Sequence, residues 1–350
     1  MAPRLALAVT LGACSTKPSG APAPAPVTAV PAVVRDAARD PELAALASAA
    51  LACEWDPIHG YDHMTCPAME AWLAHGRGAA LDEDTLVDML EDRDEHRRHL
   101  AAEKLHAGGV RYRTDRALAG RVVRVAERES VAPVVFPLGY VVSDIDLAAT
   151  RTADGVRTLV TAHPDHIMRA HVVGGVVTAN PRSEEAFAIA KAGFADDDWL
   201  VRASALDEIV AATNHVDEAC TLALSAVPKG DPDVASAAMR AIDQHHTCDG
   251  RPGDVIAAIG ERVANKRLRF DFNAGLDLQN ACASPKATSQ DKSRAAAIGR
   301  TMVAQDDLAD FRGAALYAVF ACDPHTGRVL ASTLLHDHDV AQAAKDILAR

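Results

Sequence analysis

Histidine side chains are the first candidates for chemistry, because the chain carries 15 of them in 350 residues. His163, His166 and His171 are close in sequence, and imidazoles three and five positions apart partly share one face of a helix. Neutral imidazole is a common zinc ligand, so these three residues are candidate metal ligands. They also fit a simpler interpretation, as polar residues of a surface turn and helix start. We therefore expect no metal and no other cofactor. A metal-binding or enzymatic protein with its site in these His-rich turns is the alternative.

Asp144 and Asp146 form the other pattern that is compatible with catalysis, because paired carboxylates can act as general acid and base. These two lie in an expected connection between helices and have no identifiable companion. Gly-x-Ser-x-Gly, Walker and dinucleotide-binding glycine patterns are missing from the sequence. We identify no small-molecule substrate and predict that the protein is not an enzyme.

Gly174 and Gly175 are expected inside a helix, where they permit tight packing.

Cys14 stands apart near the N-terminus of a chain with seven cysteines, an odd number. A positive charge at Arg4 and an apolar run over residues 5–13 precede it, which is typical of an export signal. The sequence LGAC that ends at Cys14 resembles the lipobox of bacterial lipoproteins, in which the cysteine is acylated and becomes the first residue after cleavage. This resemblance implies a signal peptide over residues 1–13 and lipid attachment at Cys14. An ordinary secretory signal with an incidental cysteine is the alternative.

Residues 14–32 are rich in proline and alanine and too poor in large apolar side chains to fold. In a polyproline II conformation, at ~3.1 Å per residue, such a tether spans on the order of 50 Å. Ser15 follows the cysteine, which in lipoproteins of two-membraned bacteria resembles sorting to the outer membrane. The resemblance therefore implies a bacterial envelope protein that faces the periplasm and touches the membrane through acylated Cys14.

Composition limits both the fold and the partners. Apolar residues make up 49% of the chain but aromatic residues only 4%, and this alanine-rich balance favours close-packed helices over strands. The formal net charge is -12, and the only concentrated basic run is at 266–269, so we expect no nucleic-acid partner. Past the N-terminal region, no segment has the roughly 18 uninterrupted apolar residues that a membrane-spanning helix needs.

A recurring helical pattern organises the rest of the chain. With Arg202 as an anchor, Asp198 lies four residues before it, and apolar Val201, Ala205 and Ile209 lie at positions -1, +3 and +7. The aspartate occupies the place of an N-cap, and the apolar residues share one helical face. The same frame recurs at spacings of 29 to 43 residues, mostly 33 to 36, with anchors at Arg98, Pro133, Arg169, Arg202, Ala235, Arg269, Arg312 and Ala341.

Two units fit this frame only in part. After Pro133, Phe136 and Tyr140 take the +3 and +7 positions, and after Arg269 the +7 position is Leu276. Upstream of the anchors, amphipathic segments predict partner helices, as at Glu184–Ala195, Val216–Val227 and Asp254–Asn265. Each unit is therefore expected to be a helical hairpin.

The D-x-x-V-R-x-x-A-x-x-x-L/I frame and its recurrence resemble the HEAT-repeat family, in the short form common in bacteria. The expected fold is all-α, a solenoid of about eight stacked antiparallel helix pairs over residues 33–350, with an armadillo-type superhelix. This fold implies a scaffold that binds a protein partner. Exposed acidic residues such as Asp207 and Glu208 are expected to favour basic or polar partner surfaces. A structural spacer in the envelope is a further alternative.

Six cysteines remain besides Cys14, and export makes disulfides possible. Sequence alone leaves fifteen connectivities open, but distant repeats cannot touch, so sequential pairing is the economical choice. Buried free thiols are the alternative. The candidate pairs are Cys53 with Cys66, Cys220 with Cys248, and Cys282 with Cys322.

Overall fold

The computed structural model of the protein describes residues 41–62, 65–76, 81–265, 272–305 and 309–350. In these residues the chain is almost entirely helical, and strand pairing is limited to the short antiparallel hairpin of β1 (Trp55–Asp56) and β2 (Gly60–Tyr61). The all-α prediction is therefore confirmed. Cys14, the expected signal peptide and tether, and the anchor Arg269 lie outside the described residues.

The helices fall into two recurring kinds and a few additional elements. We call the helices that carry the repeated frame second helices: α4 (Glu95–Gly108), α6 (Ala132–Ser143), α9 (His166–Val173), α12 (Trp199–Ala211), α14 (Pro232–His245), α16 (Phe272–Ala283), α18 (Ala309–Cys322) and α20 (Ala341–Ala349). The partner helices precede them: α3 (Glu83–Leu90), α5 (Arg116–Ala126), α8 (Ala153–Ala162), α11 (Glu184–Phe194), α13 (Val216–Lys229), α15 (Pro252–Ala264), α17 (Ser289–Val303) and α19 (Pro324–Thr333). The remaining helices are α1 (Pro41–Ala50), α2 (Pro67–Ala74), α7 (Leu147–Thr150) and α10 (Val176–Ala179).

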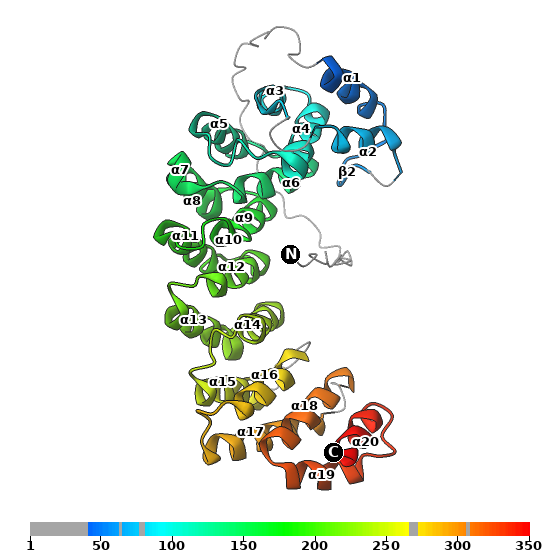
Figure 1. Cartoon of the computed structure of the whole chain (residues 1–350), viewed down its shortest axis with the longest axis vertical. Coiled ribbons are helices and arrows are strands. Elements are labelled where there is room, and N and C mark those ends of the chain that lie inside the picture. The colour runs from blue at the N-terminus through cyan, green and yellow to red at the C-terminus, as the bar shows by residue number, and fades with distance from the viewer. Residues whose placement is uncertain (1–40, 63–64, 77–80, 266–271, 306–308) are drawn as a thin grey trace, which may run out of the picture. The chain divides into compact units, whose positions relative to one another are not determined.

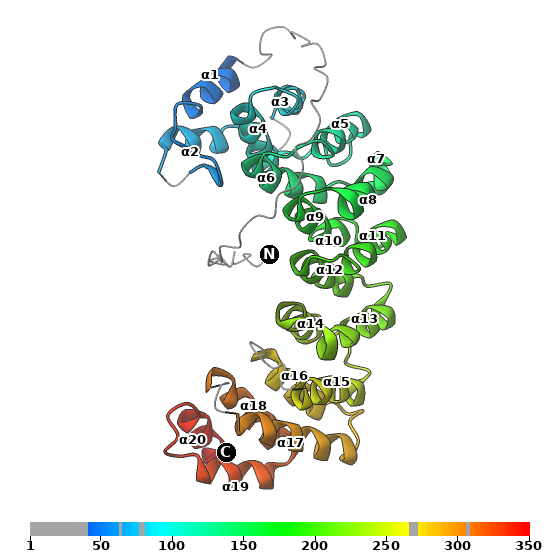
Figure 2. The same cartoon turned by 180° about the vertical axis from the view of Figure 1, so that it is seen from behind.

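Contacts between helices follow chain order. Each partner helix contacts the second helix that follows it, and each second helix contacts the next second helix along the chain. Figure 1 shows the neighbours α6, α9, α12 and α14 with α5, α8, α11 and α13 along one side, and Figure 2 shows the same neighbours from behind. At the N-terminal end, α1 packs on α2, and both contact α4.

The turn aspartates start the second helices as the frame predicted. Carboxylates that accept an amide hydrogen bond from the first turn lie at Asp94, Asp165, Asp198 and Asp231, with N···O distances of 2.7 to 3.1 Å in their shortest bonds. Such caps satisfy amides that have no partner inside the helix. The last unit differs, because α20 begins only at Ala341, and Asp337 instead accepts from the amide of Asp339 at 3.1 Å and from Arg312.

The apolar frame positions are buried in most units. Fully or almost fully buried +3 and +7 residues are Ala101, Leu105, Val172, Val176, Ala205, Ile209, Ala238, Ile242, Ala315, Val319 and Ala344. The prediction that Leu348 is the buried +7 residue of the last unit was wrong. Leu348 is 39% exposed, and its neighbour Ile347 is buried instead. A shift of one residue turns a side chain by about 100° around a helix, which is enough to exchange the core for solvent.

The predicted burial was also wrong in α6 and α16, the two helices whose units fit the frame only in part. In α6, Phe136 is 51% exposed and Tyr140 is half-buried, while Val134 and Leu138 are fully buried. In α16 the expected +7 residue Leu276 is only half-buried. The fully buried apolar residues there are Ala274 and Leu278, so the frame of this helix is displaced by two residues.

Gly174 and Gly175 lie between two helices and not inside one, because α9 ends at Val173 and α10 begins at Val176. A Cβ atom on Gly175 would come within 2.6 Å of Oγ of Ser143 at the end of α6. The glycine therefore permits a close approach between adjacent units, as expected, although at a helix break.

Arginines at the anchor position connect adjacent units, and we call Arg98, Arg169, Arg202 and Arg312 the anchor arginines. Each donates to backbone carbonyls in the turn or helix end that precedes its own helix, and also to a carboxylate in the turn before the next second helix. Arg169 illustrates the pattern: Nη1 lies 2.8 Å from the carbonyl of His163, and Nε lies 2.8 Å from Asp196. Planar guanidinium groups suit this double role because they donate several hydrogen bonds in fixed directions.

Three disulfides join the six described cysteines. Cys53 pairs with Cys66, Cys220 with Cys248, and Cys282 with Cys322, at Cα–Cα distances of 6.0, 5.2 and 5.2 Å. The first closes the segment that holds the β hairpin, the second joins α13 to the turn after α14, and the third joins α16 to α18. These are the pairs that sequential pairing favoured.

The buried apolar residues form two clusters that meet at α12 and α13. One contains residues from Leu43 to Ala219, and the other contains residues from Leu206 to Ile347. Among the helices that the structure describes, none combines the length and the apolar character that crossing a bilayer requires.

Candidate functional site

The three candidate histidine ligands make separate contacts. His163 is buried at the end of α8, where Nε2 lies 3.1 Å from the carbonyl of Glu129 and Nδ1 accepts from the amide of Asp165 at 3.1 Å. His166 is exposed at the start of α9, and His171 places Nδ1 3.1 Å from the carbonyl of Phe136 in α6. Within the described ranges, no group of three or more histidine, cysteine or acidic side chains is arranged to hold a metal ion. The structure therefore does not bring these histidines together as one ligand set.

The carboxylate pair in the connection after α6 has structural partners. Asp144 forms an ion pair with Arg113 at 3.0 Å. Asp146 caps α7 by accepting from the amide of Ala149 at 2.9 Å. Both carboxylates therefore have local roles, at the end of α6 and the start of α7.

Of the two acidic residues of α12 that were expected to be exposed, one is buried and the other is paired at the surface. Glu208 is buried and accepts from the amides of Val177 and Thr178 at 2.8 and 2.7 Å, so it caps α10 in the preceding unit. Asp207 is half-buried and lies 2.9 Å from Arg240. The expected exposure was therefore wrong for Glu208, whereas the bias of Asp207 toward basic or polar partners stays a prediction. The sequence pattern carries no sign of their partners, which come from adjacent units.

A group of aromatic and histidine rings lies on the second helices instead. We call His106, Phe136, Tyr140 and His171 the aromatic-histidine patch. Tyr140 is central: its ring centroid lies 5.0 Å from His106, 5.5 Å from Phe136 and 4.2 Å from His171. Phe136 and His171 also touch, at 4.4 Å. The rings come from α4, α6 and α9, which are three successive second helices.

The patch combines an exposed aromatic ring with neutral imidazoles. Burial lowers the pKa of His106 and of His171 below the usual histidine value, so the uncharged form of both rings is favoured at neutral pH. In each case nearby groups oppose the shift only in part: Asp144 for His106, and the Phe136 carbonyl for His171. The patch is therefore an apolar surface with polar ring atoms, suited to contact with another side chain and not to tight binding of an anion.

Proline chemistry in α6 fixes this part of the surface. Pro137 lies inside the helix and has no amide, so the carbonyl of Pro133 lacks its usual helical partner. Nδ1 of buried His99 in α4 occupies that place, 2.8 Å from the carbonyl oxygen. The tautomer with hydrogen on Nδ1 is required for this bond. The bond that compensates for Pro137 thus joins α4 to α6, the helix that carries Phe136 and Tyr140.

Two buried cations that the sequence pattern did not indicate also join units through backbone carbonyls. Lys104 of α4 donates to the carbonyls of Trp72 and Leu73 at the end of α2, at 2.6 and 3.1 Å. Arg262 of α15 donates to the carbonyls of Val227 and Gly230 around the end of α13, at 2.9 and 3.2 Å. Both satisfy helix C-termini, which carry partial negative charge. Their role is in packing.

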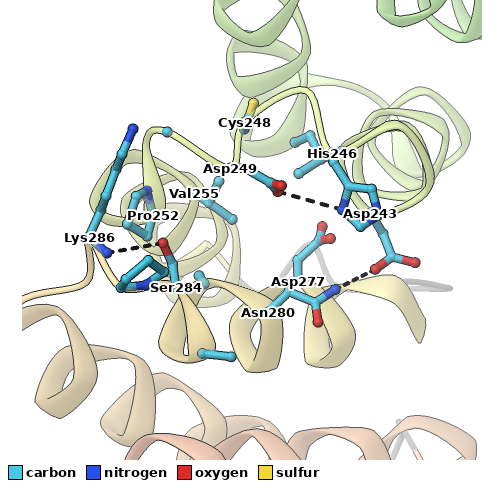
Figure 3. Close-up of a pocket in the computed structure, with 15 residues that line it drawn as sticks. Asp243, His246, Cys248, Asp249, Pro252, Val255, Asp277, Asn280, Ser284 and Lys286 are labelled. Carbon is cyan, nitrogen blue, oxygen red and sulfur yellow. Dashed lines mark hydrogen bonds and ion pairs between the residues drawn. The ribbon is translucent and has the colours of Figure 1, made fainter.

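A pocket of about 500 Å³ lies between the end of α14, the turn before α15, and α16. Its wall includes the buried Asp277, together with Asp243, Asp249 and Lys286 (Figure 3). Asn280 donates to Asp243 at 2.6 Å, on the same side of the pocket as Asp277. Sequence reasoning missed this site, because the frame assigned Leu276 to the core and gave no indication that Asp277 is buried.

Comparisons of the chain with family models, with curated proteins and with solved structures find no match.

Proposed function

We propose that this protein is a scaffold that binds another protein through the aromatic-histidine patch on its second helices. The observation that carries the proposal is the position of Phe136, which is 51% exposed and packs edge-on against Tyr140 and His171. Aromatic residues held rigid at a surface are the side chains that most often dominate binding energy at protein interfaces. Exposure of such a ring has a cost in water that contact with a partner removes.

The proposed architecture is a HEAT-like solenoid, in which the helix pairs stack unit upon unit. The contacts between successive second helices and the anchor arginines that connect units support it. In such a fold, neighbouring units expose equivalent positions side by side, so a binding surface extends over several helices. The occupant that suits this patch is a protein segment with an apolar or aromatic side chain, because the imidazoles are neutral and the patch offers no net charge.

The proposed location is the periplasmic side of a bacterial outer membrane, with the chain held by acylated Cys14. The three disulfides support export, because disulfides persist in oxidising compartments and are rare in the cytosol. Cys14 is left without a partner by that pairing, which suits attachment of lipid. Metabolic labelling with a fatty acid analogue tests this part of the proposal: wild type should take up label, and Cys14→Ser should not.

Site-specific photocrosslinking tests the scaffold. A photoreactive phenylalanine analogue is placed at position 136 and, as the matched control, at position 329, where Val329 is 55% exposed on partner helix α19. In native cells, position 136 should give one recurrent protein adduct that Tyr140→Ser removes, and position 329 should not give it. A spacer without a ligand gives no recurrent adduct at either position, and that result contradicts the proposal.

Metal analysis of the purified full-length chain separates the enzymatic or metal-binding alternative. The alternative is supported if the wild type contains stoichiometric zinc and the His163→Ala, His166→Ala or His171→Ala variant does not. Because His171 also belongs to the patch, the informative variant is His166→Ala, whose exposed side chain is outside it.

A further inference from the structure

The pocket beside α16 contains a buried acid, Asp277, that has no counter-charge bonded to it in the part of the chain that the structure describes. Asp277 is 2% exposed, and within the described residues neither of its carboxylate oxygens has a hydrogen-bond partner. Figure 3 shows the carboxylate directed from α16 into the pocket, toward the side that carries Asp249 and His246. Buried carboxylates are normally hydrogen-bonded or paired, so each exception needs a reason.

Other buried acids in this protein show the normal situation. Glu83 accepts from the amides of Val110, Arg111 and Tyr112 at 2.8, 2.7 and 2.6 Å. Glu208 likewise accepts from two backbone amides and from the hydroxyl of Thr178. The fold therefore satisfies buried carboxylates where they have a structural role. Asp277 has no such role in the described residues.

The charges around Asp277 increase the need for a positive partner. Burial raises its pKa well above the usual value, and the nearby Asp243 raises it further. The pocket wall carries three carboxylates, at Asp243, Asp249 and Asp277, against one lysine, at position 286. Lys286 is exposed, and its backbone amide is bonded to Ser284. Because its pKa is raised, Asp277 holds a proton more tightly than an exposed aspartate does, and a cation that enters the pocket takes the place of that proton.

We propose that this pocket binds an organic cation, an ammonium or guanidinium group on an alkyl stem, with Asp277 as its principal anion. A guanidinium group satisfies both carboxylate oxygens at once, and an ammonium group satisfies one or both by separate hydrogen bonds. Ile242, Pro252 and Val255 supply apolar wall against which the stem packs. The pocket volume is within the range of small-ligand sites.

A metal ion is a poorer match to the same residues. The acidic side chains of the pocket do not converge into a ligand cluster, and part of the wall is apolar. Metal sites need several ligands at fixed short distances, whereas an organic cation needs one good anion and a wall. The cation has two possible sources, a free amine or the lysine or arginine side chain of a partner, and the test distinguishes them.

Calorimetric titration of the full-length chain tests the proposal with butylguanidinium, butylammonium and neutral butylurea. Both cations should bind and butylurea should not. Asp277→Asn, which keeps the shape and removes the charge, should weaken cation binding by about tenfold or more. Asp243→Asn should weaken it less, and Lys286→Ala should strengthen it, because the remaining charge of the site becomes more negative.

Melting temperature distinguishes a binding role from a structural one. Asp277→Asn should leave the melting temperature unchanged or raise it, because it removes an unpartnered buried acid. The matched control Glu208→Gln should lower the melting temperature and leave cation binding unchanged, because that acid caps α10 and lies outside the pocket. A loss of stability in Asp277→Asn as large as that of the control would overturn the assignment.

Capped peptides identify the source of the cation. Tighter binding of an acetylated, amidated Gly-Arg-Gly than of butylguanidinium indicates a partner side chain, and exclusion of the peptide with retained butylguanidinium binding indicates a free amine. Both results support the site. The proposal is wrong if wild type binds neither cation, binds them as well in the Asp277→Asn variant, or binds Ca²⁺ alone.

Discussion

Two regions of this protein join their units in different ways. In residues 95–211, which we call the arginine region, Arg98, Arg169 and Arg202 each reach across to a carboxylate of the next unit. In residues 216–322, the cysteine region, the anchor of α14 is Ala235, which has no side chain to reach across. There the disulfides Cys220–Cys248 and Cys282–Cys322 hold helices together. In the arginine region charge connects the units. In the cysteine region the Cys282–Cys322 bridge joins α16 to α18, the Cys220–Cys248 bridge closes one helix pair, and charge still connects the last unit through Arg312.

This difference shows what the anchor position contributes. A guanidinium group satisfies carbonyls of its own unit while it pairs with the next unit, so it aligns two units at once. Alanine at the same place gives closer packing and no connection. The cysteine region also holds Asp277, whose carboxylate has no hydrogen-bond partner among the described residues.

The largest expected effect is on the cysteine region. Replacing Cys282 and Cys322 by alanine removes a bridge across 40 residues, which in the chain-entropy account lowers the free energy of unfolding by about 4 kcal/mol. Hydrogen exchange should become faster in α16 to α18 and stay unchanged in α4 to α9. The matched control is Cys53→Ala with Cys66→Ala, which should affect only the N-terminal end. Faster exchange in both regions after loss of the Cys282–Cys322 bridge would remove the distinction between them.

Acid should weaken the arginine region selectively, through His99. Burial lowers the pKa of this imidazole from 6.5 to about 4, and the bond to the Pro133 carbonyl offsets the shift only in part. Because the unfolded chain binds the proton more tightly, the stabilisation is complete above pH 6.5 and is lost as the pH falls toward 4. The free energy of unfolding should decrease by up to about 3 kcal/mol over that range.

Urea unfolding at a series of pH values measures this contribution. His99→Gln should flatten the pH dependence between pH 6.5 and 4, whereas the exposed control His166→Gln should retain it. An unchanged slope in the His99 variant would assign the acid sensitivity to other groups.

Loss of an anchor arginine should cost about 2–3 kcal/mol, less than loss of a bridge. Arg169→Ala removes the pair with Asp196, both largely buried, and leaves carbonyls of the preceding turn without their donor. Arg157→Ala is the control, because its partner Asp154 is fully exposed and such pairs contribute little. Chemical denaturation of the two variants side by side gives the difference. If both variants lose the same free energy of unfolding, the anchor arginine contributes no more to stability than an exposed arginine does.

The smallest expected effect is at a helix start. Asp198→Ala removes the carboxylate that accepts from the amide of Leu200 at 2.8 Å, which should lower stability by about 1 kcal/mol. Asp197→Ala changes the exposed neighbour and should shift stability by less than about 0.5 kcal/mol. Thermal melts of both variants suffice, and a larger loss from the neighbour would contradict the capping assignment.

The sequence predicted those parts of the fold that repeat. Amide capping at Asp94, Asp165, Asp198 and Asp231, and buried residues at +3 and +7, follow from helix periodicity and helix ends, which are local properties. The frame failed where that signal is weak. In α6 a proline takes the anchor position and the N-cap residue, Val131, has no capping side chain. The frame assigned Phe136 and Tyr140 to the core there, although they lie in the surface patch.

The candidate sites depend on contacts between units, which periodicity does not encode. Asp277 lies between two leucines of α16, and only the correct register of this helix reveals that it is buried. The buried state of Glu208 likewise depends on amides 30 residues away. No local signal in the sequence marks Lys104 or Arg262 as buried cations. The predicted lipid anchor and protein partner remain predictions.

The two ways of joining units also determine how the chain would respond to a mechanical load. Ion pairs between units separate reversibly and re-form when tension is released, so the units of the arginine region can yield one at a time. A disulfide prevents the segment that it encloses from being extended by force unless a covalent bond breaks. This applies to the residues between Cys220 and Cys248 and to those between Cys282 and Cys322. A pulled molecule would therefore lengthen outside these two enclosed segments first, and the units of the arginine region are among the parts that can lengthen.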